Sequence, residues 1–367
     1  MDRCKVLFIA SSPRIGFTNS FLDLVQALQN RCCIEVLTWD KEQDPGLFDK
    51  MRMLNIKFII LPSLEGKGGI SMIKSVSRIA DLALENRYDV VHCNTQWQVI
   101  LAAIARCILK LNRNVKVPKV VSTIHSFNTR QSIKRFIHRH FSQGVICLSE
   151  FSMNEVGIRH SSVCHWGVDD SLEDSHDELG DCLREKIGLN SKLFKVLVVA
   201  NFTQNKGYDE LIGIATALAS QCHFIFLGSY GDMQPKVERL LRKNGVSHFL
   251  GRVQKEHMNA IYRSCDVFLS MSRSETFGLS LLEALYNRLP VVCTPVGIAP
   301  EVVVDSFNGY LVKDRFEAEE RIRRLMVRGL ENNMEAARQV IMNEYSWNKV
   351  SRSYFEVYTQ TKEERYR

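Results

Sequence analysis

Two glutamates, Glu275 and Glu283, lie eight positions apart in the stretch 266–290. Carboxylates accept hydrogen bonds from sugar hydroxyl groups, including those of a ribose. Gly278 lies between them and lets the backbone approach a ligand without a Cβ in the way. It also precedes a predicted helix, whose first N–H groups suit a diphosphate. The stretch therefore suits a nucleotide-activated ligand, although two glutamates at this spacing also occur by chance.

The stretch 266–290 reads as a strand, a loop, a helix and the start of another strand. An apolar run of strand character opens it, and leucines then recur at helical spacing over 279–285. Pro290 requires the helix to end before it. Glu275 is therefore predicted in the loop and Glu283 about one turn inside the helix.

Two basic side chains follow predicted strands elsewhere in the chain. Lys206 lies between the predicted strand 195–200 and a predicted helix, where a lysine can neutralise a phosphate. A solvated loop lysine is the alternative. His125 follows the predicted strand 119–124, where it could contact a donor sugar or its phosphate, and a core or capping histidine is the alternative. His92 also ends a strand and is expected to be structural.

The segment 128–143 is rich in basic residues and contains four large apolar ones, Ile133, Phe136, Ile137 and Phe141. These four are expected to share one face of a basic amphipathic helix. One interpretation is a surface helix that packs on its own domain. The other is a site that contacts anionic lipid or a lipid-phosphate acceptor.

Several motifs that would indicate other chemistry are missing from the sequence. The loop after the first predicted strand has no GxGxxG, which disfavours a nicotinamide dehydrogenase. There is no P-loop motif, which disfavours a P-loop ATPase, and no HExxH, DxD or Cys/His cluster to indicate a metal site. We therefore expect neither a metal nor a cofactor.

Composition indicates an ordinary globular chain. It has 367 residues, 45% hydrophobic and 24% charged, enough for two domains. The 48 basic and 41 acidic residues give a net charge of +7, which favours an anionic partner, while no nucleic-acid-binding motif is present. The 11 scattered cysteines suggest a reducing compartment, and no apolar run reaches membrane-spanning length. The sequence thus predicts a cytoplasmic protein, with possible peripheral contact to the inner face of the cell membrane.

Predicted strands alternate with helices in two series, which indicates two doubly wound parallel sheets. An acidic stretch at 167–188 separates the series, and we predict domains at 1–168 and 169–346 with a C-terminal segment at 347–367. Ligands in such sheets bind beyond the carboxyl ends of the strands. The predicted strands are 5–10, 34–37, 57–61, 89–92, 119–124 and 144–148 in the first series, and 195–200, 223–227, 246–250, 267–269, 291–293 and 308–312 in the second.

Taken together, these motifs resemble glycosyltransferase family 4, the retaining group 1 glycosyltransferases of the GT-B fold. The resemblance is strongest over 195–312, where VLVVANFTQNKGYDELI and SETFGLSLLEALYNRLPVV follow the family pattern. DVVHCNTQ, STIHSF and HWGVDD fall in family order upstream, and EYSWNKVSRSYFEVY resembles the closing helix, which in this fold crosses back to the first domain. The resemblance implies two Rossmann-like domains that face a central cleft.

The resemblance also implies roles for individual residues. Glu275 would hold the hydroxyl groups of the donor sugar, Glu283 its ribose and Lys206 the diphosphate, while His125 would lie by the donor sugar. The backbone after Glu275 would hold sugar and phosphate, and a second group of residues would lie near the base. These two groups are Thr276, Phe277, Gly278 and Leu279, and Gly251, Arg252 and Val253.

Three departures from the family pattern concern phosphate and acceptor binding. Ala200-Asn201 replaces the usual Gly-Arg, so one of two phosphate-binding cations is missing. Losing one charge-assisted contact costs roughly 1.5–3 kcal/mol unless Arg252, Arg273 or Arg288 supplies it. Arg288 itself replaces a family glycine, and the glycine-rich acceptor loop is reduced to Gly16.

The sequence thus predicts a metal-independent retaining glycosyltransferase. It would move a sugar from a UDP- or GDP-sugar to a glycan or lipid-linked acceptor, in the biosynthesis of surface polysaccharide or lipopolysaccharide. Two alternatives stay open. Asn201 favours a non-catalytic nucleotide-sugar-binding subunit, and a nucleotide-sugar epimerase of the same fold would convert the donor without an acceptor.

Overall fold

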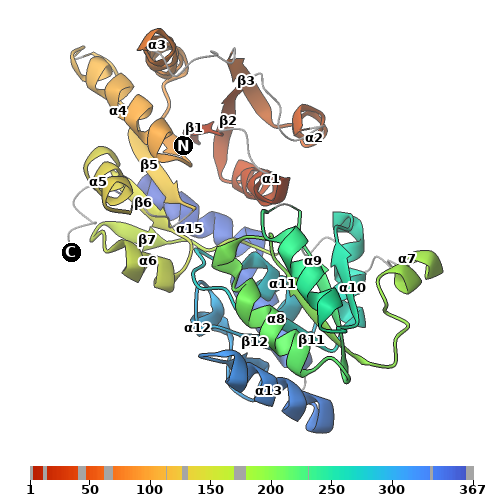
Figure 1. Cartoon of the computed structure of the whole chain (residues 1–367). Coiled ribbons are helices and arrows are strands. Elements are labelled where there is room, and N and C mark those ends of the chain that lie inside the picture. The colour runs from red at the N-terminus through yellow and green to blue at the C-terminus, as the bar shows by residue number, and fades with distance from the viewer. Residues whose placement is uncertain are drawn as a thin grey trace. The chain divides into compact units, whose positions relative to one another are not determined.

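The computed structural model divides into two compact units. Unit 1 comprises Met1–Gly167 and Trp347–Arg367, and unit 2 comprises Val168–Ser346. Each unit is an α/β domain built on one parallel sheet (Figure 1). The residues that the structure describes are 3–10, 15–39, 47–61, 69–112, 114–125, 131–168, 179–229, 231–330 and 334–360.

The sheet of unit 1 has seven parallel strands in the order β3-β2-β1-β4-β5-β6-β7. Six of them overlap predicted strands. The seventh, β7, was not predicted because its three residues are not an apolar run, and it is defined by backbone pairing with β6. The strands are β1 (Cys4–Ile9), β2 (Cys32–Trp39), β3 (Lys57–Leu61), β4 (Val90–Cys93), β5 (Lys119–Ile124), β6 (Gly144–Cys147) and β7 (Ser161–Val163).

Helices cover both faces of this sheet. Along β1, Val6 and Phe8 pack into one core with α1 and α15, and Leu7 and Ile9 pack into another with α3 and α4. Alternate side chains of a strand point to opposite faces, so both faces of the sheet are buried. The helices of unit 1 are α1 (Ile15–Gln29), α2 (Leu47–Met53), α3 (Gly69–Asn86), α4 (Gln96–Lys110), α5 (Gln131–Phe141), α6 (Glu150–Val156) and α15 (Trp347–Thr359).

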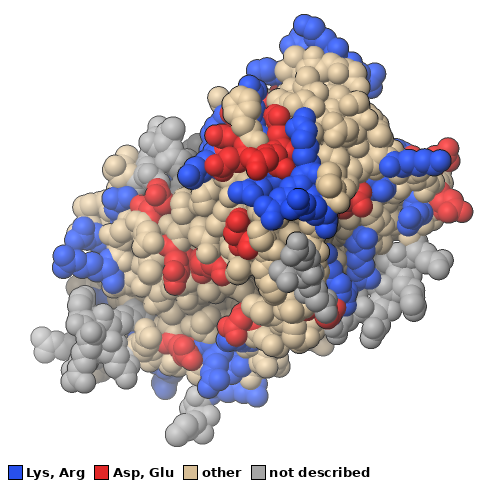
Figure 2. Space-filling view, turned by 90° about the horizontal axis from the view of Figure 1, so that it is seen from below, with Lys and Arg blue, Asp and Glu red and all other residues tan. Residues whose placement is uncertain are grey.

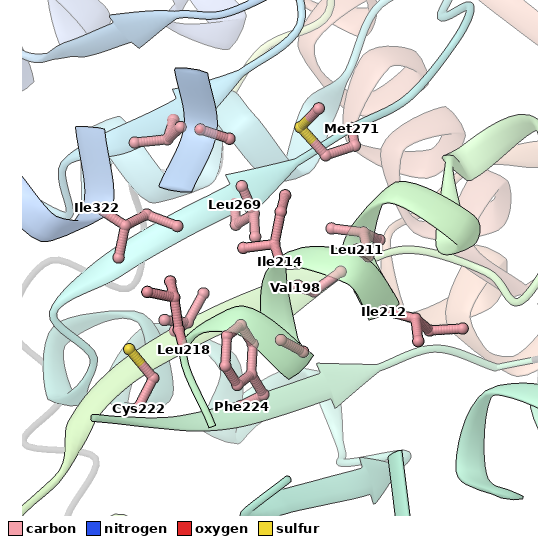
Figure 3. Close-up of a cluster of buried hydrophobic side chains, with 14 of the residues drawn as sticks. Val198, Leu211, Ile212, Ile214, Leu218, Cys222, Phe224, Leu269, Met271 and Ile322 are labelled. Carbon is pink, nitrogen blue, oxygen red and sulfur yellow. The ribbon is translucent and has the colours of Figure 1, made fainter. Parts of the chain in front are cut away.

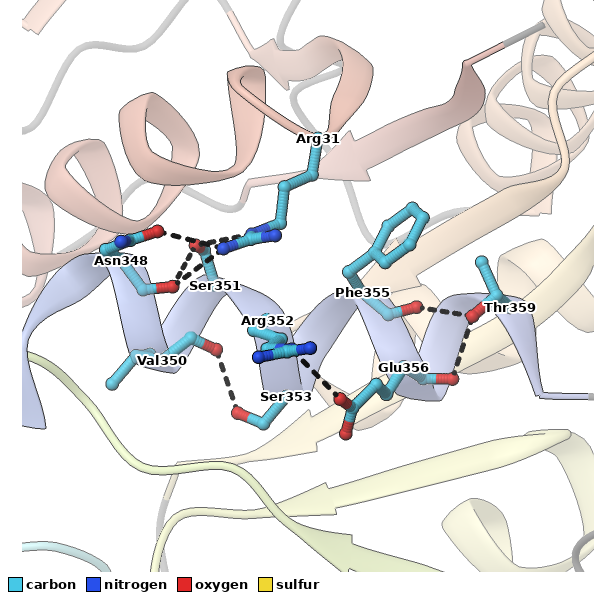
Figure 4. A network of polar contacts seen from close by, with 9 residues as sticks. All are labelled: Arg31, Asn348, Val350, Ser351, Arg352, Ser353, Phe355, Glu356 and Thr359. Atoms are coloured by element: carbon cyan, nitrogen blue, oxygen red, sulfur yellow. Dashed lines mark hydrogen bonds and ion pairs between the residues drawn. The ribbon is translucent and has the colours of Figure 1, made fainter. Parts of the chain in front are cut away.

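The last helix, α15, follows unit 2 in the sequence but belongs to unit 1. Arg31 holds its first turn (Figure 4): Nη2 donates to Oδ1 of Asn348 at 2.9 Å, and Nε donates to Oγ of Ser351 at 3.1 Å. Deeper in the unit, the hydroxyl group of Tyr358 lies 2.6 Å from Nδ1 of the buried His92. Burial raises the pKa of Tyr358, so the hydroxyl keeps its proton and donates a hydrogen bond to the imidazole. The structural role expected for His92 is confirmed by this contact.

The sheet of unit 2 has six parallel strands in the order β10-β9-β8-β11-β12-β13. Its core lies between this sheet and α8, where Val198, Ile214, Phe224 and Leu269 pack together (Figure 3). The strands are β8 (Phe194–Val199), β9 (Cys222–Leu227), β10 (His248–Gly251), β11 (Val267–Ser270), β12 (Val291–Cys293) and β13 (Gly309–Leu311). All six overlap predicted strands because each is a short apolar run between polar loops.

Helices follow most strands of unit 2, and short 3-10 turns η1 (Gln204–Lys206) and η2 (Lys255–His257) precede two of them. α11 ends at Tyr286, before Pro290, as predicted. The helices are α7 (Asp181–Lys186), α8 (Tyr208–Ala217), α9 (Gln234–Lys243), α10 (Met258–Ser264), α11 (Leu279–Tyr286), α12 (Ala299–Val302), α13 (Arg315–Arg328) and α14 (Met334–Tyr345). Among the helices that the structure describes, none is both long enough and apolar enough to cross a membrane.

Both sheets contain a topological switch point, where strands that are distant in sequence lie side by side. In unit 1 it falls between β1 and β4, and in unit 2 between β8 and β11. The loops that leave neighbouring strands in opposite directions open a crevice at such a point, and ligands of doubly wound sheets bind there. The prediction of two Rossmann-like parallel-sheet domains is confirmed.

The segment forms the predicted amphipathic helix α5, but only one of its four large apolar residues is buried. Ile137 is buried in the core beneath α3 and α4, whereas Ile133 and Phe136 are 60% and 56% exposed and Phe141 is also exposed. The side of α5 that faces the domain is formed by Ile137 and the buried His138. A polar ring is therefore buried there, while most of the apolar residues of the helix are exposed. Residues 128–130 of the predicted segment lie outside the described residues.

The Tyr358–His92 contact predicts a large effect of a small change. Tyr358→Phe removes the hydroxyl and leaves Nδ1 of His92 buried without a partner, so the free energy of unfolding should fall by about 1–3 kcal/mol. Arg352→Ala, which breaks an exposed ion pair to Glu356 on the same helix, should change it by less than about 1 kcal/mol. Urea denaturation of both variants measures this, and equal losses would contradict the role given to the buried bond.

Candidate functional site

The loops after β8 and β11 meet at the switch point of unit 2. Gly207 has a φ of +68°, and a Cβ on it would lie 2.0 Å from the carbonyl oxygen of Met271. Only glycine therefore permits this approach. The two loops are also joined by hydrogen bonds, from the backbone N–H of Arg273 to the carbonyl of Asn205 at 2.9 Å and from the Asn205 side chain to the carbonyl of Ser274 at 2.8 Å.

This contact brings together Lys206 and Glu275, two of the predicted site residues. The ammonium group of Lys206 pairs with Oε1 of Glu275, and the two side chains are 22% and 21% exposed. Oγ of Ser272 donates to the same carboxylate oxygen at 2.9 Å. The carbonyl of Ser272 in turn accepts a hydrogen bond from Thr294 at 2.6 Å. A carboxylate and an ammonium group are thus fixed side by side at the edge where ligands of such sheets bind.

A third loop, after β12, supports Glu275 from behind. The backbone N–H of Ile298 donates to the carbonyl of Phe277 at 2.6 Å. Gly297 has a φ of +63°, and a Cβ there would lie 2.2 Å from that same carbonyl oxygen and 2.8 Å from Cβ of Glu275. Gly297 is not among the predicted site residues. The signal was present, because a glycine in the loop that follows a parallel strand often marks a close approach of backbone.

Gly278 and Glu283 lie at the start of α11 and within it. Gly278 precedes the first helical residue with a φ of +100°, so the helix begins one residue after it, at Leu279. The half-buried carboxylate of Glu283 accepts a hydrogen bond from the hydroxyl of Tyr262 at 2.9 Å. Burial, and then the charge of Glu283, raise the pKa of Tyr262 well above its usual value, so this hydroxyl stays a donor. Tyr262 orients Glu283, and no sequence motif indicated it.

Asn201 follows β8 and binds the neighbouring loop after β9. Its Oδ1 accepts hydrogen bonds from Oγ of Ser229 at 2.9 Å and from the backbone N–H of Ser229 at 3.4 Å. A Cβ on Gly228 would lie 2.3 Å from the carbonyl oxygen of Ala200, so these two loops also touch through backbone. Gly251 ends the next strand, β10, and its carbonyl accepts from the N–H of Gly228 at 3.0 Å. Arg252, exposed, and Val253, half-buried, follow on this edge of the sheet.

Two of the three arginines that could replace the missing cation are engaged elsewhere. Arg273 pairs with Asp209 and donates to the carbonyl of Gln204 at 2.7 Å. Arg288 follows the end of α11, at the edge of the sheet opposite to Glu275, and pairs with Glu335 of α14. The suggestion that Arg288 supplies a phosphate contact is therefore wrong, because α11 carries it to the far end of its strands.

His125 belongs to unit 1, where it follows β5. Its Nε2 donates to Oδ1 of Asn94 at 2.9 Å, and its ring centroid lies 5.6 Å from that of Trp166. Burial, with a smaller effect of His138, lowers the pKa of His125 to about 3. The imidazole is therefore neutral at physiological pH, and it offers hydrogen bonds rather than a positive charge.

Gly16 was predicted in a loop after the first strand. The structure begins α1 at Ile15, so Gly16 lies in the first turn of a helix, and that prediction is wrong in its local structure. Residues 11–14, between β1 and this helix, lie outside the described residues. Over the described ranges, no three His, Cys, Asp or Glu side chains gather as a metal site would require.

The Gly297 contact predicts a specific loss of stability. Gly297→Ala introduces a Cβ that overlaps backbone, whereas Gly245→Ala introduces one at a similar φ of +65° into open space. Both pay about 1–2 kcal/mol for the left-handed backbone, and only Gly297→Ala should lose a further 1–3 kcal/mol, roughly, to overpacking. Urea denaturation compares the two. Equal losses of unfolding free energy would mean that the loop after β12 can move to accommodate the added Cβ, which would contradict the prediction.

Because it contains buried neutral histidines, the folded protein should lose free energy of unfolding as the pH falls. Burial, with a smaller effect of Lys134, lowers the pKa of His138 to about 4. Between its unfolded pKa of about 6.5 and this value, the unfolded chain binds a proton that the folded chain does not, so His138 alone costs about 2 kcal/mol near pH 5. His138→Gln should reduce the shift in urea midpoint between neutral and acidic buffer, and His140→Gln, at an exposed position of α5, should not. Equal shifts in all three proteins would refute this assignment.

Two family models match the chain. One, described as glycosyl transferases group 1, matches residues 181–347, and the other, described as glycosyltransferase family 4, matches residues 16–171. Together they span most of unit 2 and most of unit 1.

Curated relatives and solved structures agree with these matches. The chain is 25% identical over 310 residues to an uncharacterised glycosyltransferase of Methanocaldococcus jannaschii, MJ1178, covering 81% of this chain and 80% of the relative. It is 24% identical over 299 residues to an uncharacterised protein in the cps region of Klebsiella pneumoniae, covering 74% and 79%. The structure of Anabaena Alr3699/HepE in complex with UDP and glucose matches with a TM-score of 0.80 at 19% identity, covering 98% and 100%. The predicted GT-B fold is confirmed by this likeness, and the chain belongs to the group 1 glycosyltransferases of family 4.

Proposed function

We propose that this glycosyltransferase transfers a sugar, with retention of configuration, from a nucleotide-diphosphate sugar to a glycan or lipid-linked acceptor. The observation that supports the proposal is the Lys206–Glu275 pair at the switch point of unit 2. It offers a cation for phosphate and a carboxylate for sugar hydroxyls within one site. UDP- or GDP-sugars are the proposed donors, and HepE, which shares the fold, has been crystallised with UDP and glucose.

Lys206 and the start of α11 would bind the diphosphate. An ammonium group and the N-terminus of a helix both stabilise negative charge, which grows on the diphosphate as the bond to the sugar breaks. The proposal needs no metal, because these two groups provide the positive charge. Gly278 would let the phosphate approach the backbone at the first turn of α11.

Glu275 and Glu283 would bind the two sugars of the donor. Oε1 of Glu275 is held by Ser272 and Lys206, so its carboxylate is fixed before a ligand arrives. Glu283, oriented by Tyr262, would accept hydrogen bonds from the ribose. Residues 251–253, at the end of the edge strand β10, would lie near the base.

Retention would follow from attack on the same face of the sugar that the diphosphate leaves. The bond between the anomeric carbon and the phosphate oxygen breaks, and a bond from that carbon to the acceptor oxygen forms. The proton of the acceptor hydroxyl passes to the departing phosphate oxygen. Glu275 acts in this scheme as a hydrogen-bond acceptor and not as a nucleophile, because the acceptor oxygen itself attacks the anomeric carbon.

The acceptor and the biosynthetic pathway are proposed from the charge of α5 and from a related protein. A relative lies in the cps region of Klebsiella pneumoniae, which supports a role in the biosynthesis of surface polysaccharide or lipopolysaccharide. Lipid-linked acceptors of such pathways would be met at the cytoplasmic face of the membrane, and basic α5, with Arg135 and Arg139 exposed, would bring the protein there.

Glu275→Ala and Lys206→Ala should each abolish sugar transfer while the protein stays folded. Loss of one charge-assisted contact in the transition state lowers the rate by roughly 10²–10³-fold. Lys195→Ala is the matched control, because Lys195 pairs with Asp266 at 3.5 Å at the opposite end of the same two strands. Full activity in both variants would show that Glu275 and Lys206 are not part of the donor site.

The assay also separates the alternatives. Thermal-shift screening against nucleotide diphosphates and their sugars comes first, followed by slow hydrolysis of any donor that stabilises the protein. Stabilisation without turnover would favour a non-catalytic binding subunit, and conversion of the donor without an acceptor would favour an epimerase. No stabilisation by any nucleotide would count against the proposed site itself.

A further inference from the structure

The outer side of α4 carries an apolar stripe that nothing in the described chain covers. Trp97, Ile104, Ile108 and Leu111 are all exposed, and Leu111, which caps the helix, is 85% exposed. They are spaced at i, i+7, i+11 and i+14, so they lie along one line of the helix. Large apolar side chains are ordinarily exposed singly, and a continuous stripe of them marks a surface of contact.

The stripe is part of a layer of three helices. α4 packs against α3 on one side and against α5 on the other, over one face of the sheet of unit 1 (Figure 1). α5, which packs next to α4, also exposes two large apolar side chains, Ile133 and Phe136. We call these six residues, Trp97, Ile104, Ile108, Leu111, Ile133 and Phe136, the α4–α5 surface.

The two helices that form this surface carry only basic charges, whereas the neighbouring α3 also exposes Asp81 and Glu85. α4 and α5 contain no aspartate or glutamate, and Lys110, Arg135 and Arg139 are exposed on them. The face drawn in Figure 2 differs, because there lysine and arginine side chains lie among aspartate and glutamate side chains. An apolar stripe on helices whose charged side chains are all basic matches a layer that is anionic outside and apolar inside.

We propose that the α4–α5 surface docks on an anionic lipid bilayer, with the apolar stripe inserted at the boundary between headgroups and acyl chains. Helices that lie in this plane present apolar and aromatic residues to the acyl chains and bases to the headgroups. A second copy of the chain is a poorer occupant, because an isologous contact would place the same basic side chains against one another. The membrane contact would extend along the whole length of α4, and α5 would add to it at one side.

The orientation of α4 connects this surface to the predicted site of unit 1. α4 begins at Gln96, directly after β4, and Asn94 in this turn accepts the hydrogen bond from His125. Trp97, in the first turn of α4, therefore lies at the same edge of the sheet as His125. Docking through the stripe would hold that edge close to the headgroup layer, where a lipid-linked acceptor presents its reacting hydroxyl.

Vesicle sedimentation of the full chain tests the proposal. The wild-type protein should bind vesicles of phosphatidylcholine mixed with phosphatidylglycerol, more weakly at high salt, and should not bind phosphatidylcholine alone. Ile104→Ser with Ile108→Ser should weaken binding by roughly tenfold or more, and Arg135→Gln with Arg139→Gln by roughly the same factor. The matched control is Val327→Ser with Val340→Ser, which removes two exposed apolar side chains of unit 2 and should leave binding unchanged.

Fluorescence gives an independent readout. Among the tryptophan side chains that the structure describes, Trp97 is the exposed one, so insertion should shift its emission to shorter wavelength, and Trp97→Phe should remove that shift. Equal binding by the isoleucine variant and the control would overturn the proposal. So would failure to bind anionic vesicles, or a dimer in solution that the isoleucine variant converts to monomer.

This inference rests on the membrane location within the proposed function, but its test uses no sugar donor. Loss of vesicle binding with intact thermal stabilisation by nucleotides would refute the lipid surface alone. Intact vesicle binding without nucleotide stabilisation would refute the donor site alone.

Discussion

The candidate site depends on close backbone contact between loops at one edge of the unit 2 sheet. Gly207 lies against the carbonyl of Met271, and Gly297 lies against the carbonyl of Phe277. Neither approach is possible with a Cβ. These two contacts set the position of the loop that carries Glu275 relative to Lys206, so the charged pair is a consequence of glycine at two backbone positions.

The two units provide different kinds of chemistry. The site in unit 2 consists of an ion pair and a helix N-terminus, and it suits phosphate and sugar together. At the corresponding edge of unit 1, the described groups His125 and Asn94 are neutral: burial keeps His125 uncharged, and its Nε2 donates a hydrogen bond to Oδ1 of Asn94. These two neutral groups suit an uncharged hydroxyl group, which is in line with the proposal of donor binding in unit 2 and acceptor binding in unit 1.

The departure at Asn201 has a structural reason in this chain. Its side chain joins the loop after β8 to Ser229 after β9, and so it holds the backbone in place where the family has a cation. Arg288 is at the wrong edge of the sheet, and Arg273 is paired with Asp209. Lys206 is therefore the cation that the described structure places beside Glu275.

The α/β class, the strands of both sheets except β7, and the choice of Lys206, Glu275 and Glu283 as candidate site residues could all be predicted from the sequence. These features are local, since apolar runs, helix stops and motif spacing lie within short stretches. The partners that position these residues, such as Gly297 and Tyr262, could be found only in the folded structure, because each comes from a different strand-loop-helix unit. The same holds for α5. Helical periodicity says which residues share a face, but packing of the neighbouring helices decides which face is buried, and that left Ile133 and Phe136 exposed beside α4.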